Sequence, residues 1–214
     1  MLQSNFAAVS RRYDSLRSHF DHVRLERPTT VEDKLRQWRI LEGILSSAWQ
    51  AWCGFSRSVL IKSCNGTTTR TGLNVAAPPA PIPEGRISYI AKCLANRSII
   101  KDNKVIAPHQ EPTWGDRQIV LDAARHLAVG NVGSLELGLL LITRAATDMR
   151  TVRNASAHLS RANLQEVQAL AAYYHGSSLR HPTEMLLWTE NQSGENCFHL
   201  WLTDLLDCAE LMTE

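Results

Sequence analysis

Apolar residues recur at intervals of three and four along most of the 214-residue chain, the spacing of helices that bury one face. The first such stretch runs from about residue 2 to residue 27 and ends before Pro28. Its apolar positions are Phe6, Val9, Tyr13, Leu16 and Phe20. Thr29 can cap a second helix, and Glu32, three positions later, would complete a capping box. The pattern therefore predicts two consecutive N-terminal helices.

The second helix keeps its apolar spacing for about seven turns. Its apolar positions are Leu35, Trp38, Leu41, Ile44, Leu45, Ala48, Trp49, Trp52, Phe55, Val59 and Leu60. Three tryptophans on one helix favour packing in a core or subunit interface over a platform for stacking nucleic-acid bases.

The composition changes to Thr, Gly and Pro from about residue 65 to residue 85. We interpret this segment as a long irregular loop within one domain, because neither flank alone holds enough apolar residues for a separate core. Further helices are predicted at about 87–96, from a cap at Asp116 to near Gly130, from Ser134 past Val152, at about 163–174 and at 197–211, with a second loop at 101–112.

Strand patterns are too few to predict a sheet, and the segment 181–190 is ambiguous between an extended stretch and a helical turn. We therefore expect an all-α fold, a helical bundle with a long Pro/Thr/Gly-rich loop, formed by a single domain over residues 1–214.

The composition is that of a globular protein without a strong overall charge or a membrane-spanning segment. The apolar fraction of 44% and charged fraction of 21% are typical of a globular chain. A net charge of +2 means that any nucleic-acid contact must come from a local basic cluster. No signal-peptide pattern and no run of about 18 uncharged apolar residues occurs, so no membrane association is expected.

Cysteine usage and motif spacing argue against metals and cofactors. The five cysteines form no CxxC pair, which favours free thiols and a cytoplasmic location. Cys93, Cys197 and His199 lack the spacing of a zinc site. No phosphate-binding glycine motif is present, and we expect neither a metal nor a cofactor.

One segment is a candidate functional motif, Arg153-Asn154-Ala155-Ser156-Ala157-His158. On an ideal helix Arg153 falls beside Ile142 and Met149, within an apolar stripe and away from His158. A buried unpaired charge is costly, so this arginine needs an anion, a carboxylate partner or an exit to solvent. The plain structural interpretation is a carboxylate partner in a neighbouring helix, with His158 an ordinary exposed residue.

The segment resembles the motif of the HEPN family (higher eukaryotes and prokaryotes nucleotide-binding), helical-bundle domains with an Arg, a polar residue and a His after four to six intervening residues. Arg153, Asn154 and His158 fill those positions with the shortest spacing. The resemblance implies metal-independent endoribonuclease activity, as in many members, with Arg153 and His158 catalytic and Asn154 supporting. Other members of the family have lost this activity or act only by binding.

The expected chemistry is attack of an RNA 2′-OH on the adjacent phosphorus, leaving a 2′,3′-cyclic phosphate. Arginine offers a permanently charged donor fork to phosphate oxygens, and histidine exchanges protons near neutral pH. One histidine cannot easily act as both base and acid, so a homodimer with a composite site is expected, as is usual in the family. Arg144, Arg150 and Arg161 would bind the RNA backbone in a local basic groove.

The resemblance also implies a role as a toxin or in defence against phage, with an antitoxin or defence-system partner protein. Some members continue as His-x-Tyr, the Tyr being modified by a partner antitoxin, but here Leu159 and Ser160 follow the histidine. Neutralisation by that route is therefore not expected. The alternatives are a non-catalytic HEPN-type module for dimerisation, nucleotide binding or RNA binding, and an interaction protein of unrelated helical fold.

Overall fold

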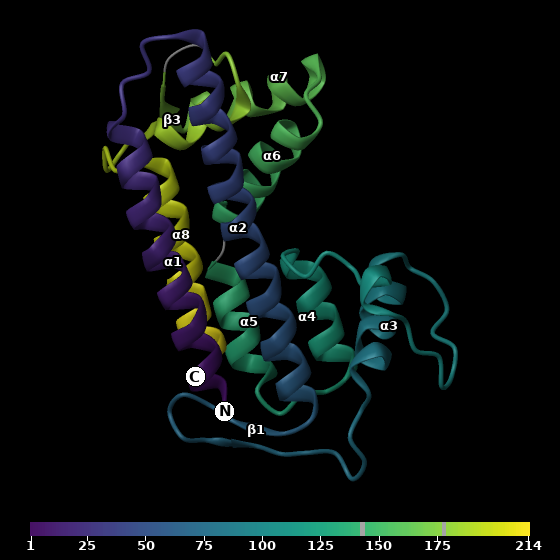
Figure 1. Cartoon of the computed structure of the whole chain (residues 1–214). Helices are drawn as coiled ribbons and strands as arrows, with labels where there is room; N and C mark the ends of the chain where they lie inside the picture. Colours follow the sequence, from purple (N-terminus) through teal and green to yellow (C-terminus); the bar gives the residue numbers. More distant parts are fainter. Residues whose placement is uncertain (142–143, 177–178) are drawn as a thin grey trace. The chain divides into compact units, whose positions relative to one another are not determined.

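The computed structural model describes residues 1–141, 144–176 and 179–214 (Figure 1). It confirms the all-α helical class. The α-helices are α1 (Leu2–Leu25), α2 (Val31–Cys64), α3 (Glu84–Ala95), α4 (Arg117–His126), α5 (Val132–Leu141), α6 (Ala145–Ala157), α7 (Arg161–Ala169) and α8 (Cys197–Met212). Short 3₁₀ helices are η1 (Pro108–Gln110), η2 (Leu170–Ala172) and η3 (Pro182–Leu187).

The chain divides into two compact units, each assembled from separate segments. Unit 1 consists of Met1–Ser10, Ala51–Ile142 and Leu206–Glu214, and unit 2 of Arg11–Gln50 and Thr143–Leu205. Helices α1, α2 and α8 contribute residues to both units. The single domain expected over residues 1–214 stays a prediction.

Unit 1 packs α3, α4 and α5 with the ends of α2 and α8 that belong to it. Its buried apolar side chains include Trp52, Phe55, Val59, Leu60, Ile87, Val120, Leu135 and Leu139. Gly138 allows a close approach of helices, because a Cβ added there would lie 2.6 Å from Met212 Cγ and 2.7 Å from the Cys208 carbonyl oxygen. The core of this unit therefore depends on a small residue in α5.

Unit 2 packs α6, α7, η2 and η3 with parts of α1, α2 and α8. Its buried apolar side chains include Tyr13, Phe20, Leu41, Leu45, Met149, Val152, Leu186 and Trp201. The rings of Phe20 and Phe198 lie 4.8 Å apart between centroids, which ties α1 to α8 within this unit. The apolar stripe of α6 faces the same core.

The long loop at 65–85 is present, but it is not wholly irregular. Strands β1 (Thr67–Thr68) and β2 (Asn74–Val75) pair antiparallel, and strands β3 (Tyr174–His175) and β4 (Thr189–Glu190) form a second small sheet. The prediction that no sheet forms is therefore wrong. Strands of two residues are too short for an alternating pattern to reveal.

Several helix boundaries differ from the sequence predictions. The capping box of α2 lies at Thr30 and Asp33, because the Asp33 N–H donates to Thr30 Oγ1 and the Thr30 N–H donates to Asp33 Oδ2, each at 3.1 Å. Asp116 caps α4 as predicted, but the helix ends at His126, before Gly130. In place of one helix from Ser134 past Val152, the structure describes α5 and α6 separately, and Ile142 lies outside the described residues.

Helix α5 also buries a different face from the predicted one. Leu137, Leu140 and Leu141 are more than half exposed, whereas Leu135 and Leu139 are buried. Helix α5 is apolar on nearly every side, so spacing alone cannot select its inner face. Among the described helices, none is long and apolar enough to cross a membrane.

Candidate functional site

The motif predicted from sequence lies within unit 2, at the end of α6 and the turn before α7. Arg153 and Asn154 belong to the last turn of α6, and His158 is the residue directly after it, with φ −133° and ψ 72°. The His158 N–H donates to the Asn154 carbonyl oxygen at 2.9 Å. The helical projection that separated Arg153 from His158 therefore does not hold at His158, because the backbone has left the helix there.

The backbone of the turn is held on both sides of Ser160. The Asn163 side-chain amide donates to the His158 carbonyl oxygen at 2.6 Å, and the Asn163 N–H donates to Ser160 Oγ at 3.1 Å. Ser160 is thus the N-cap of α7. This cap was not predicted from the sequence, although a serine before a helical run is a recognised signal. The two bonds give His158 a defined backbone while its side chain stays exposed.

Arg153 reaches solvent instead of a carboxylate. Its side chain is half-buried beside the buried Val152, and its Nη1 donates to Asn154 Oδ1 at 3.1 Å. Within the described residues, no carboxylate lies at ion-pairing distance from Arg153. Of the three solutions open to an arginine in an apolar stripe, the structure has the exit to solvent, with Asn154 as a polar neighbour.

Arg144, expected to bind substrate, has partners inside unit 2. Its Nη2 pairs with Asp148 Oδ2 at 3.2 Å, and its guanidinium carbon lies 3.1 Å from the ring centroid of Tyr173. Asp148 is buried and also accepts a 2.8 Å hydrogen bond from the Tyr174 hydroxyl, which accepts one of 3.0 Å from Trp201 Nε1. This buried polar chain ties the first turn of α6 to β3 and α8.

The titration of Asp148 reflects its burial. Desolvation raises the pKa of this carboxyl above its ordinary value, and the hydrogen bond from Tyr174 and the charge of Arg144 only partly oppose it. Burial also raises the pKa of the Tyr174 hydroxyl, and the neighbouring Asp148 adds to the shift. We infer that these hydrogen-bonded side chains anchor α6, since they lie at the opposite end of the helix from His158.

Arg150 and Arg161 complete the predicted set. Arg150 is half-buried on α6, one turn before Arg153, and Arg161 is exposed as the first residue of α7. The N-terminus of a helix carries partial positive charge, so the start of α7 adds to the field of Arg161 beside His158. The structure therefore places five of the six predicted site residues in one helix–turn–helix segment, with Arg144 tied at its far end.

The long α2 helix offers a test of the tryptophan interpretation. Trp49 and Trp52 are buried, and Trp52 Nε1 donates to the Gly115 carbonyl oxygen at 3.3 Å. Trp38 stacks on His181 with centroids 5.0 Å apart and donates to Glu184 at 3.2 Å. All three rings serve internal packing. Among the described residues, no group of three His, Cys, Asp or Glu side chains is placed to hold a metal ion.

We compared the chain with models of protein families, with curated proteins and with solved structures. No significant match was found. The resemblance to the HEPN family therefore rests on the segment from Arg153 to His158 and on the helices around it.

Proposed function

We propose that the protein is a metal-independent endoribonuclease of the HEPN type, which cleaves RNA through 2′-OH attack and leaves a 2′,3′-cyclic phosphate. This proposal rests on the accessibility of two side chains, His158 and Arg153. His158 is exposed on a backbone held by Asn154 and Asn163, and Arg153, less than two turns earlier, has no carboxylate partner within the described residues. A basic and a titratable group left accessible in this way suit phosphate chemistry.

Each side chain has a distinct role in the proposed reaction. His158 takes the proton from the 2′-OH or gives one to the leaving 5′-oxygen. Arg153 donates to the non-bridging oxygens, where charge builds up in the transition state. Asn154 positions Arg153, since its Oδ1 accepts a hydrogen bond from that guanidinium. This role for Asn154 replaces the more general support inferred from the sequence.

The proposed reaction needs a second copy of the chain. One imidazole cannot supply both proton transfers in a single step, so two copies would each present His158 and Arg153 to one phosphodiester. Arg150, Arg161 and the N-terminus of α7 would bind the neighbouring phosphates, with Arg144 contributing less because Asp148 already neutralises it.

We propose a biological role as a toxin or anti-phage defence protein in the cytoplasm, with an antitoxin or defence-system protein as partner. Because Leu159 and Ser160 follow His158, a partner that modifies a tyrosine of the motif is not expected. Regulation by a protein that covers the exposed turn from His158 to Arg161 fits the structure better.

A non-catalytic HEPN-type module for dimerisation, nucleotide binding or RNA binding is the second candidate. One observation favours it. The ion pair of Arg144 with Asp148 leaves the segment with less free positive charge than the sequence suggests, which would weaken RNA binding and catalysis alike.

The test is cleavage of a mixed RNA substrate in EDTA by the wild type, by His158→Ala and by His109→Ala. His109 is an exposed histidine in η1, so His109→Ala is the matched control. We expect cyclic-phosphate ends from the wild type and the control, and a rate about 10²- to 10⁴-fold lower with His158→Ala. Thermal melts of the three proteins should coincide.

Two results would count against the enzyme. Wild-type protein that binds RNA without cleaving it would support the binding module, and equal cleavage by all three proteins would remove His158 from the mechanism. The mass in solution tests the composite site separately, because a protein that stays monomeric with RNA bound cannot bring two copies of His158 together.

A further inference from the structure

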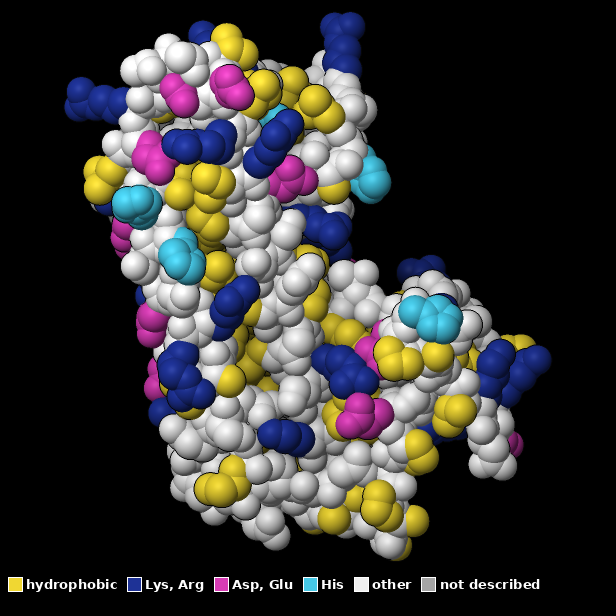
Figure 2. All heavy atoms as spheres, in the orientation of Figure 1, with side chains coloured by type: hydrophobic (Ala, Val, Ile, Leu, Met, Phe, Trp, Pro, Cys, Tyr) yellow, Lys and Arg dark blue, Asp and Glu magenta, His cyan; other side chains and the backbone are white. Residues whose placement is uncertain are grey.

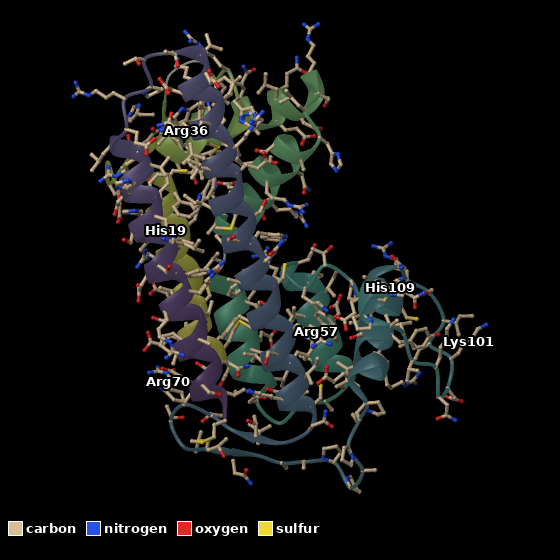
Figure 3. All side chains as sticks on the ribbon, in the orientation of Figure 1. His19, Arg36, Arg57, Arg70, Lys101 and His109 are labelled. Atoms are coloured by element: carbon tan, nitrogen blue, oxygen red, sulfur yellow. The ribbon has the colours of Figure 1, made fainter. Side chains whose placement is uncertain are left out.

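A second candidate site lies wholly in unit 1, between α3 and the loop that follows it. A cavity of about 490 Å³ opens there. Its lining consists of residues of α3 and its C-terminus, of the loop 98–106 and of η1, among them Tyr89, Lys92, Ile99, Lys101, Lys104 and Val105. Figure 3 labels Lys101 on this loop. The volume lies in the range of cavities that bind small molecules.

The loop is fastened to α3 by specific contacts. Arg86 Nη1 donates to the carbonyl oxygens of Lys101, at 2.5 Å, and Lys104, at 3.3 Å. The Tyr89 hydroxyl accepts a hydrogen bond from the Lys101 N–H at 3.0 Å. The loop backbone also runs close to Gly85, where an added Cβ would lie 2.6 Å from the Ile106 carbonyl oxygen. The walls of the cavity are therefore preformed, which lowers the entropic cost of binding.

The lining of the cavity is strongly basic. The chain contains five lysines (34, 62, 92, 101 and 104), and three of them line this one cavity. No acidic residue is among the described lining residues. Lys92 Nζ donates to the Gln110 carbonyl oxygen at 2.9 Å, and Lys104 Nζ lies 5.4 Å from the Tyr89 ring centroid. Neither contact neutralises a charge, so the cavity attracts anions.

Apolar side chains stand beside the lysines. Ile99 is 84% exposed and Val105 is 55% exposed, and both line the cavity. In Figure 2 basic and apolar side chains lie next to each other over this loop. Apolar side chains left in water at the rim of a basic cavity would gain from contact with an apolar part of a ligand.

We propose that this cavity binds a small organic phosphate. The lysines would hold the phosphoryl group, whose double negative charge matches several ammonium groups better than a single carboxylate would. The apolar body of the ligand would cover Ile99 and Val105. The limited volume of the cavity favours a small molecule over a polymer or a lipid surface. This site is separate from the proposed ribonuclease motif, and its test does not depend on RNA cleavage.

The experiment is calorimetric titration of the full chain with phenyl phosphate, inorganic phosphate and phenol as probes. We expect phenyl phosphate to bind more tightly than either of the others, because only it carries both chemical features. Lys101→Met combined with Lys104→Met should weaken binding of phenyl phosphate about tenfold or more, while Lys34→Met, a lysine outside the cavity, should leave it unchanged.

A second variant tests the apolar half of the site without disturbing the core. Ile99→Ser should bring the affinity for phenyl phosphate toward that for inorganic phosphate, and we expect the variant to fold because the Ile99 side chain is exposed. Absence of phenyl phosphate binding, phenyl phosphate binding no tighter than that of inorganic phosphate, or binding unaffected by the lysine double variant would each overturn the proposal.

Discussion

Arg57 in unit 1 and Arg153 in unit 2 are both half-buried arginines on helices, yet their guanidinium groups have different partners. Arg57 donates from Nε and Nη2 to the two carboxylate oxygens of Glu111 at 2.7 and 2.8 Å, and Nη2 also reaches Glu84 at 3.0 Å. Arg153 donates to the neutral amide oxygen of Asn154 at 3.1 Å. Figure 3 labels Arg57 beside α2.

The difference separates a structural arginine from a candidate functional one. Glu111 is satisfied from three sides, by Arg57, by Trp114 Nε1 at 2.7 Å and by Ser88 Oγ at 3.0 Å, so its loop is fixed to α2 and α3. A carboxylate partner of this kind is what the plain structural interpretation expected for Arg153. Its absence among the described contacts of Arg153 leaves that guanidinium available to an external anion.

The two units also differ in the net pKa shift of a carboxyl group that is largely withdrawn from solvent, Glu111 in unit 1 and Asp148 in unit 2. At Glu111 burial raises the pKa, but the hydrogen bonds from Arg57, Trp114 and Ser88 outweigh it, and the net shift is downward. At Asp148 burial again raises the pKa, and its two partners do not outweigh it, so the net shift is upward. The number and charge of the donors decide the direction.

The largest effect on stability should follow loss of the unit 1 ion pair. Arg57→Met would leave Glu111, whose side chain is only 10% exposed, without its charged partner, and we expect a loss of about 3 kcal/mol in the free energy of unfolding, measured in urea. The control Glu84→Gln breaks only the exposed arm and should cost about 0.5 kcal/mol or less. Similar small effects in both variants would end the view of Arg57 as a structural arginine.

The buried chain of unit 2 should be the next most sensitive. Tyr174→Phe removes the donor to Asp148, which keeps Arg144, and leaves the buried Trp201 Nε1–H without its acceptor, so it should cost about 2 kcal/mol. Tyr173→Phe keeps the ring under Arg144 and should cost far less, because Tyr173 is exposed. Equal melting temperatures for the two variants would show that the hydrogen bonds of Tyr174 do not anchor α6.

The two carboxyl groups should give pH effects of opposite sign. Glu111, with a lowered folded pKa, contributes stability above about pH 4.3 that is lost as the pH falls through the folded pKa. Asp148, with a raised folded pKa, contributes stability below about pH 3.9 that is lost as the pH rises through the folded pKa.

The free energy of unfolding of the wild type, Glu111→Gln and Asp148→Asn should therefore be measured from pH 3 upward, at intervals of roughly half a pH unit. The advantage of the wild type over Glu111→Gln should grow with pH, and its advantage over Asp148→Asn should shrink. Slopes of the same sign for the two variants would contradict the assignment of the two environments.

The smallest effect on stability is expected at the motif itself. Arg153→Met keeps the aliphatic stem beside Val152 and removes a single exposed hydrogen bond, so it should change the free energy of unfolding by about 0.5 kcal/mol or less. A cost close to that of Arg57→Met would mean that Arg153, like Arg57, is a structural residue.

Local spacing was enough to predict the helical class and most helices. The cap at Asp116 and the start of α8 at Cys197 follow from residues that are neighbours in sequence. The capping box of α2 was predicted one residue too early. Positions 29 and 30 are both threonine, and only the backbone conformation shows that Thr30 is the cap.

The partners of the buried charges could not be predicted. Arg57 and Glu111 are 54 positions apart, and Asp148 and Tyr174 are 26 apart, so no helical period connects them. The motif residues were visible because their chemistry is local, but the end of α6 at His158 was not. That end decides where the imidazole lies relative to Arg153.

The most direct test of the proposed enzyme compares RNA cleavage by the wild type, Arg153→Met and Arg57→Met in EDTA, at a temperature where all three are folded. We expect Arg153→Met to retain stability and to lose cleavage by about two orders of magnitude or more, while folded Arg57→Met still cleaves. Cleavage by Arg153→Met at the wild-type rate, or no cleavage by the wild type under conditions in which it binds RNA as a dimer, would contradict the proposed function.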